Sequence, residues 1–134
     1  MTRFVVDATA VLHLARRRVE VDPRHELLAP TLLRSQTLSA LHEAVRDGEL
    51  SDEEARALLP CVGPPGLKIR LLGDAVLRRN AWEVADRLGW SSTYDAEYIA
   101  LTLLQGDAFV TLNEELAQQA STIVPTASVD APGH

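Results

Sequence analysis

The sequence predicts a single α/β domain in which helices cover both faces of a central parallel sheet of about four to five strands. Short apolar runs alternate along the chain with longer segments whose apolar residues recur at helical spacing. Of the 134 residues, 46% are hydrophobic but only 4% are aromatic, so Leu, Val and Ala must build the core. A chain of this length can bury such a core without a disulfide or a structural metal.

The first third of the chain alternates strand and helix. Residues 4–6, Phe-Val-Val, form a short apolar run typical of a buried parallel strand. Residues 8–18 then have apolar side chains at broadly helical spacing. A second strand is expected at residues 26–30, and a long helix at residues 31–47 that Gly48 closes.

The middle of the chain repeats this pattern. Residues 51–54, Ser-Asp-Glu-Glu, form a capping box that opens a helix, and the Gly-Pro-Pro-Gly turn at residues 63–66 ends it. Residues 67–72 predict a third strand. The following helix, at residues 74–88, has an apolar stripe and stops at Gly89.

The remaining elements complete the alternation. They are expected at residues 95–105 (helix), 108–112 (strand), 113–120 (helix) and 123–124 (a last strand). The domain is therefore expected to span residues 1–125. Residues 126–134, which are rich in Ser, Pro, Gly and Ala, predict a flexible C-terminal tail.

The charge distribution narrows the possible functions. A net charge of -6 argues against a general nucleic-acid coat protein, which needs cationic charge over a wide face, but it leaves a nuclease open. Lys68 is the only lysine, and Arg16, Arg17 and Arg18 form a local cluster with Arg24 close by. This cluster either guides a phosphate backbone or is a solvated helix end.

The cysteine and the histidines indicate no disulfide and no zinc site. Cys61 is the only cysteine, and neither a signal peptide nor a long apolar span is recognisable, so we expect a cytoplasmic protein. The histidines are scattered without the spacing of metal ligands: His13, His25, His42 and His134.

Two aspartates stand where apolar scaffold meets a helix start, Asp7 after the first strand and Asp95 at a later helix. Parallel sheets bind ligands at the carboxyl ends of their strands, where Asp7 and the region of Asn113 are expected. Two carboxylates close together need a shared proton or divalent cation, and hard oxygen ligands favour Mg²⁺ or Mn²⁺. Near the starts of two other predicted helices stand the amides Gln36 and Asn113 in place of acids. Each aspartate also has a structural interpretation, as a strand end or a helix cap.

The order and spacing of several segments resemble a PIN domain, and the chain is similar to the toxin ribonucleases of VapBC-type toxin-antitoxin pairs. The resemblance runs from about residue 2 to residue 125 and implies a PIN-like three-layer α/β/α sandwich. The matching segments are Val5-Val6-Asp7-Ala8-Thr9 and residues 28–36, 48–50, 69–72, 94–101 and 109–113.

The resemblance implies a metal-dependent endoribonuclease. In this family four acidic positions hold one or two Mg²⁺ ions that activate water for attack on an RNA phosphodiester, leaving a 3′-hydroxyl and a 5′-phosphate. Asp7 matches the first position and Asp95 the third. Gln36 stands at the second, usually Glu, and Asn113 at the fourth, usually Asp.

Further expectations follow from the same resemblance. Thr9 and Thr111 match hydroxyl positions that hydrogen-bond carboxylates or ordered water. The expected partners are an RNA substrate, a small antitoxin protein and a second copy of the chain in a homodimer. The sequence names neither the RNA nor the surfaces for these proteins.

Each amide removes one negative charge, so metal binding should be weaker than with four acids. Glu43 lies on the same helix face as Gln36 but about 10 Å further along the axis, too far to replace it directly. Glu97 follows Asp95 by two residues, roughly 200° around the helix, so its side chain should face away from the site. Glu114 and Glu115 are expected to complement the dipole of the helix they begin, although a small register change would bring either one inward.

Three functions remain open. The first is a Mg²⁺-dependent endoribonuclease toxin in which Asp7 and Asp95 hold metal while Gln36 and Asn113 position water, and this is the function we favour. The second is a degenerate PIN domain that binds RNA or protein without cutting, its amides buried and bonded to backbone. The third, a phosphotransfer receiver domain, would need paired early acids and a late lysine that the sequence lacks.

Overall fold

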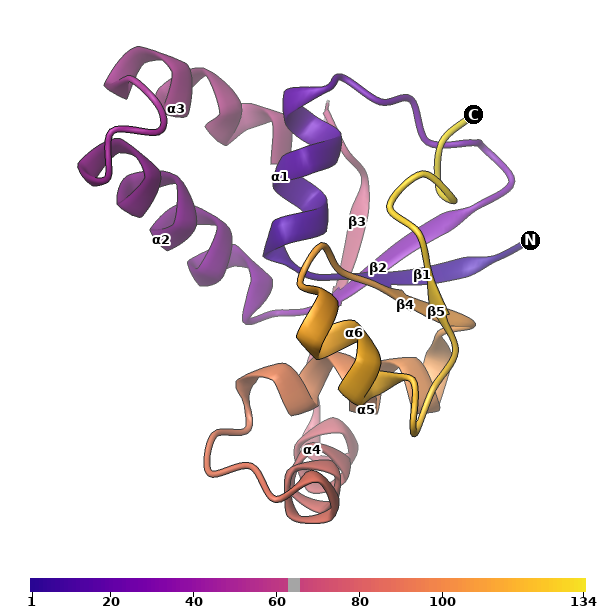
Figure 1. Cartoon of the computed structure of the whole chain (residues 1–134). Helices are drawn as coiled ribbons and strands as arrows, with labels where there is room; N and C mark the ends of the chain where they lie inside the picture. The colour runs from indigo at the N-terminus through magenta and orange to yellow at the C-terminus, as the bar shows by residue number, and fades with distance from the viewer. Residues whose placement is uncertain (63–65) are drawn as a thin grey trace.

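A computed structural model describes residues 1–62 and 66–134 (Figure 1). The strands are β1 (Arg3–Val6), β2 (Glu26–Pro30), β3 (Ile69–Leu72), β4 (Ala108–Val110) and β5 (Thr126–Ala127). The helices are α1 (Ala8–Arg16), α2 (Leu33–Arg46), α3 (Asp52–Leu58), α4 (Ala75–Leu88), α5 (Tyr94–Gln105) and α6 (Glu114–Ala120), with a short 3-10 helix, η1 (Leu59–Val62), after α3. Within the described ranges no helix is long and apolar enough to cross a membrane. Most of the turn expected at residues 63–66 lies outside the described residues.

The strands form one parallel sheet in the order β3-β2-β1-β4-β5. The chain adds β2 and β3 on one side of β1 and then crosses back to add β4 and β5 on the other. Right-handed crossovers therefore place α1 to α3 on one face and α4 to α6 on the opposite face (Figure 1). The α/β prediction is confirmed. The receiver hypothesis is wrong, because receivers have the strand order 2-1-3-4-5.

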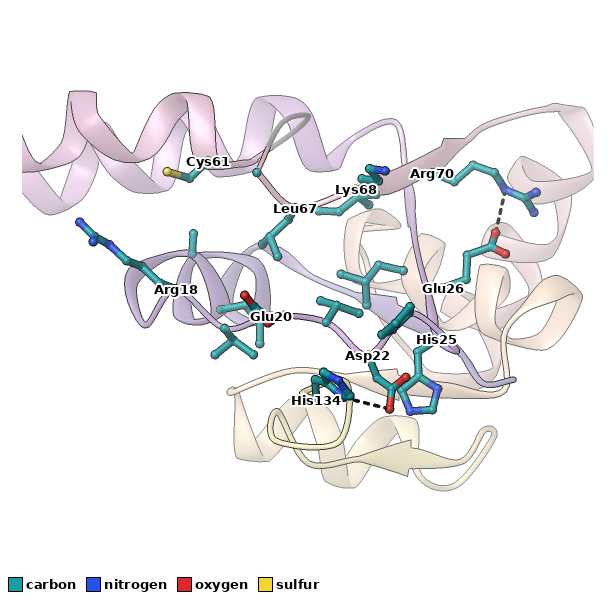
Figure 2. A pocket seen from close by; sticks show the side chains of 18 residues that line it. Arg18, Glu20, Asp22, His25, Glu26, Cys61, Leu67, Lys68, Arg70 and His134 are labelled. Carbon is teal, nitrogen blue, oxygen red and sulfur yellow. Dashed lines mark ion pairs between the residues drawn. The ribbon is translucent and has the colours of Figure 1, made fainter.

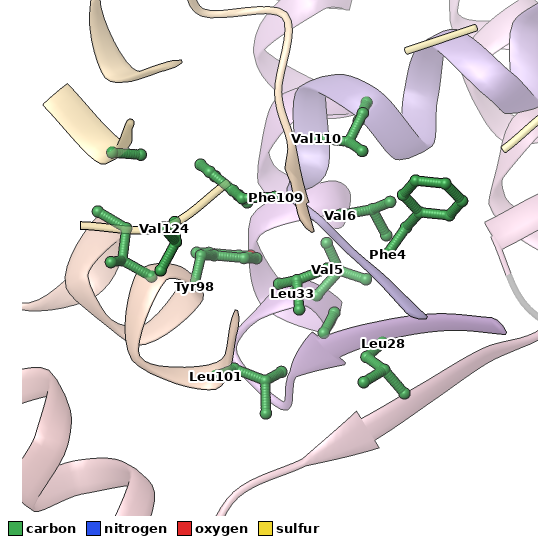
Figure 3. Close-up of a cluster of buried hydrophobic side chains, with 14 of the residues drawn as sticks. Phe4, Val5, Val6, Leu28, Leu33, Tyr98, Leu101, Phe109, Val110 and Val124 are labelled. Atoms are coloured by element: carbon green, nitrogen blue, oxygen red, sulfur yellow. The ribbon is translucent and has the colours of Figure 1, made fainter. Parts of the chain in front are cut away.

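The central strands are buried on both faces because helices cover each of them, as Figure 3 shows. The fully buried side chains on these strands include Val5, Val6, Leu28, Phe109 and Val110. Helix α5 packs against β1, β2 and β4 and adds Tyr98, whose ring centroid lies 6.1 Å from that of Phe109. Aliphatic side chains dominate this core, as the composition predicts.

Local side-chain chemistry decides where helices begin and end. The predicted capping box is confirmed: Ser51 Oγ accepts from the Glu54 N–H and Glu54 Oε1 accepts from the Ser51 N–H, both at 3.0 Å. Asp74 caps α4 by accepting from the Leu77 N–H at 2.8 Å. Gly89 ends that helix with φ 72°, a left-handed conformation that glycine adopts without a Cβ clash.

The C-terminal residues differ from the expectation. The last strand is β5, not residues 123–124, which lie in a turn after α6. Only two residues long and paired with β4, β5 has too short an apolar pattern to be recognised in the sequence. At the end of the chain the His134 N–H donates to Glu20 O at 2.9 Å. Residues 126–134 are thus bonded to the sheet and to the loop before β2, in contrast to the loose tail expected.

Candidate active site

A groove of about 300 Å³ lies at the carboxyl ends of β1 and β4, where the direction of chain progression across the sheet reverses. Such switch points are the usual ligand sites of parallel sheets. The groove is lined by residues from four distant segments: Asp7, Ala8, Thr9, Gln36, Ser39, Glu43, Asp95, Asn113 and Leu116. The structure therefore brings five of the six predicted site residues around one hollow. The sixth, Thr111, contacts Asp7 directly.

Asp7 follows the last residue of β1 and is only 6% exposed. Its Oδ1 accepts hydrogen bonds from Thr9 Oγ1 at 2.6 Å and from the Ala10 N–H at 3.0 Å. Its Oδ2 accepts from Thr111 Oγ1 at 2.5 Å. The bond from Ala10 makes Asp7 the N-cap of α1. Because a carboxylate has about four lone-pair sites, Oδ2 keeps one for a further ligand.

Two threonine hydroxyls connect the end of β1 with the end of β4. Thr9 Oγ1 accepts from the Leu112 N–H at 2.9 Å, and Thr111 Oγ1 accepts from the Asn113 N–H at 3.1 Å. Each hydroxyl therefore accepts from the backbone after β4 and donates to Asp7. Bonds on both of its oxygens hold the Asp7 carboxylate in one orientation.

Asp95 lies in the first turn of α5 and its side chain is exposed at the groove. Its pKa is raised above the usual value, first by partial burial of the carboxyl and second by the negative charge of Asp7. This repulsion indicates that the two carboxylates lie close enough to interact through the groove. Asp95 is not a helix cap, because the N-cap position of α5 is Thr93.

Gln36 is half-buried on α2, and its Oε1 accepts a hydrogen bond from the Tyr98 hydroxyl at 2.5 Å. The Tyr98 side chain is 1% exposed. Burial raises the pKa of Tyr98 well above its usual value, and the charges of Asp7, Asp95 and Glu97 raise it further. Tyr98 was not predicted as a site residue. The available signal was its position three residues after Asp95, which puts both on one face of α5.

Asn113 is the N-cap of α6, and its Oδ1 accepts from the Leu116 N–H at 3.1 Å. Asn113 is exposed at the groove, so it bonds to backbone but is not the buried amide expected for a degenerate domain. Gln36 is half-buried and bonds to a side chain instead of to backbone. Both amides thus direct their oxygen at a donor within the chain.

The other acids have clearly different positions. Glu43 lines the groove about two helical turns beyond Gln36, and its Oε2 accepts from Ser39 Oγ at 2.9 Å. Glu97, whose pKa is raised by burial, is absent from the lining, as are Glu114 and Glu115. Among the described residues no group of three or more His, Cys, Asp and Glu side chains gathers closely enough to hold a metal ion.

A second groove, of about 1280 Å³, lies at the opposite edge of the sheet beside the amino ends of β2 and β3 (Figure 2). Its lining has three cationic side chains and three acids: Arg18, Lys68, Arg70 and Glu20, Asp22, Glu26. Asp22 pairs with Arg24 at 2.8 Å and Glu26 with Arg70 at 3.3 Å. This groove therefore has neither a net charge from these groups nor an unpaired cluster of acids. Part of the predicted arginine cluster lies here, away from the smaller groove.

Comparison with known proteins extends this description. No family model matches the sequence, and no curated protein matches it. The structure is similar to the crystal structure of PAE2754 from Pyrobaculum aerophilum, with a TM-score of 0.72 and 24% identity over 97% of this chain and 91% of that one. PAE2754 is a PIN-domain protein. The chain therefore has a PIN-like α/β fold.

Proposed function

We propose that this chain is a Mg²⁺-dependent endoribonuclease that hydrolyses RNA in the groove between β1, α2 and α5. The observation that carries the proposal is that Asp7 and Asp95 line one groove, where partial burial and then the negative charge of Asp7 raise the pKa of Asp95. Two carboxylates in this relation gain from a shared divalent cation. The PIN-like fold, which often belongs to nucleases, supports the same function.

The donor set fits one Mg²⁺ or Mn²⁺ ion. Asp7 keeps a lone pair on Oδ2 and Asp95 is exposed to the groove, and both offer the hard oxygen ligands that these ions prefer. A second ion would need more negative charge than two aspartates provide. When bound, the ion would polarise the phosphate and lower the pKa of a coordinated water.

Hydrolysis forms a bond from the water oxygen to phosphorus and breaks the bond from phosphorus to O3′, which leaves with a proton. The products are a 3′-hydroxyl and a 5′-phosphate. Asp7, held by three hydrogen bonds, gives the groove a rigid acidic wall, and Asp95 gives it the opposing acid. Groups fixed in advance in this way lose little freedom when they bind the reactants.

A degenerate PIN-like domain is the second candidate. It is favoured by one observation, that the oxygens of Gln36 and Asn113 are both engaged inside the chain instead of being free for a metal. In that case the groove would bind RNA or a protein without cutting. The two candidates differ in whether the groove holds a divalent ion.

The proposal includes a toxin role, with a small antitoxin that covers the groove and a homodimeric chain. The resemblance to VapBC-type toxins supports this part. Expression of the chain should then arrest growth, and a short protein encoded directly upstream should relieve the arrest. Growth that is unaffected at high expression of an active nuclease would contradict the toxin role.

The test is calorimetric titration of metal-free protein with Mg²⁺ and Mn²⁺, followed by cleavage assays on single-stranded RNA. Asp7→Asn and Asp95→Asn should each abolish saturable binding and cleavage. Asp86→Asn, which changes an exposed acid on α4 that does not line the groove, is the matched control. Absence of binding at millimolar metal would overturn the nuclease proposal and leave the degenerate domain.

A further inference from the structure

The Gln36 side chain joins the candidate active site to the core. Its oxygen accepts from the Tyr98 hydroxyl at 2.5 Å, while the residue itself lines the groove. The phenol that makes this bond is 1% exposed and packs beside Phe109, so it has little freedom to move. The orientation of the Gln36 amide is therefore set from beneath the groove.

The hydrogen-bond inventory determines which end of the amide faces the groove. A phenol has one O–H to donate, and among the described residues the only acceptor within reach of the Tyr98 hydroxyl is Gln36 Oε1. With the amide reversed, the Tyr98 proton would lie buried without an acceptor, which is unfavourable. The oxygen therefore faces Tyr98, which leaves the amide nitrogen as the atom that can meet a ligand in the groove.

The amide nitrogen has two N–H donors, and none of the described residues accepts from them. The nitrogen is also not among the buried polar atoms that lack a partner, so solvent in the groove reaches it. An N–H group cannot ligate a cation, but it binds an anionic oxygen well. Beside Asp7 and Asp95, whose oxygens suit a cation, Gln36 provides the complementary donor.

We propose that Tyr98 is a positioning residue that turns the Gln36 amide nitrogen into the groove, where it donates to a non-bridging phosphate oxygen of the RNA strand. This inference rests on the proposed function and deepens it. It separates the roles of the groove residues: the two aspartates hold the metal, whereas Gln36 holds the phosphate. Gln36 is then a ligand of the substrate and not a weakened ligand of the metal.

The experiment uses dimethyl phosphate, a phosphodiester without base or sugar, as the probe. In the Mg²⁺-loaded protein the side-chain amide signals of Gln36, assigned by their loss in Gln36→Glu, should shift as the probe is added. Tyr98→Phe should weaken probe binding roughly fivefold to tenfold, the effect of about one ordinary hydrogen bond, because the Gln36 amide is loosened and not removed. Its Mg²⁺ affinity should stay within about twofold of the wild type, because neither residue holds the ion.

Matched variants separate this result from a general loss of structure. Tyr94→Phe removes the hydroxyl of an exposed tyrosine on the same helix and should change neither affinity. Gln36→Glu keeps an acceptor for Tyr98 but replaces the donors with an acceptor, so it should weaken probe binding and strengthen Mg²⁺ binding. This opposite response keeps the test decisive even where Tyr98→Phe lowers stability.

Two results would overturn the inference. One is a set of Gln36 amide signals that does not respond to the probe, and the other is a Tyr98→Phe variant that loses Mg²⁺ affinity as much as probe affinity. Failure of the proposed function looks different. In that case the wild type would cut no RNA although the Gln36 signals still respond to the probe. Gln36 would then bind phosphate in a protein that is not a nuclease.

Discussion

Asp7 should have a structural role that can be separated from its charge. Asp7→Ala removes the N-cap bond from Ala10 and the bonds from the two threonine hydroxyls. Loss of the cap costs about 1 kcal/mol, and loss of the bond from half-buried Thr111 to a carboxylate about 1–2 kcal/mol more. Thr9 is exposed and can bond to water instead. The expected loss is thus roughly 2–3 kcal/mol, or a Tm lower by roughly 6–12 °C for a domain of this size.

Asp7→Asn should behave differently because asparagine is an equally good cap and can bond to both hydroxyls. Its stability should stay within about 1 kcal/mol of the wild type. The assay is urea unfolding of metal-free protein followed by circular dichroism, with Asp86→Ala as the control. Equal losses in Asp7→Ala and Asp7→Asn would refute the argument, because they would show that the charge and not the hydrogen-bond pattern stabilises this corner.

Three further outcomes are expected. The raised pKa of Asp95 means that metal-free stability falls as pH rises from the usual carboxyl pKa through the folded-state pKa, so Asp95→Asn should remove this fall in Tm measured from pH 3.5 to pH 7. Gln36→Glu and Asn113→Asp should each raise Mg²⁺ affinity by roughly tenfold in calorimetry, since each adds a negative charge. No gain in either variant would contradict the expectation that the two amides weaken metal binding. Gly106→Ala should destabilise by roughly 1–3 kcal/mol in urea unfolding, because its Cβ would lie 2.7 Å from Val5 Cγ2; an unchanged midpoint would contradict this.

Much of the fold was predictable because its signals are local. The run of residues 4–6 and the capping box at Ser51 each determine an element with little help from distant residues. The strand β5 had no such signal. It exists through its pairing with β4 and through the contacts of the chain end with the loop before β2, which only the folded chain brings together.

The sequence predicted most of the residues that gather around the groove but not the hydrogen bonds between them. Asp7 and Asn113 were predicted to lie close together, whereas their shared role as helix caps emerged from the structure. The bond between Tyr98 and Gln36 joins residues 62 positions apart, so no local sequence pattern could predict it. Glu43 was expected to lie too far along α2 to replace Gln36 directly, and the structure adds that the groove extends far enough for Glu43 to line it.

The two amides preserve the fold of the site while changing what it offers to a ligand. A carboxylate at position 36 or 113 would present one oxygen to a fixed donor, the Tyr98 hydroxyl or the Leu116 N–H, and Gln36 and Asn113 still do so. The difference lies in the second atom of each group, which changes from an acceptor to a donor. The scaffold consequently tolerates either chemistry. Gln36→Glu and Asn113→Asp should therefore fold as the wild type does, and any change they cause in metal or phosphate binding reports on the groove alone.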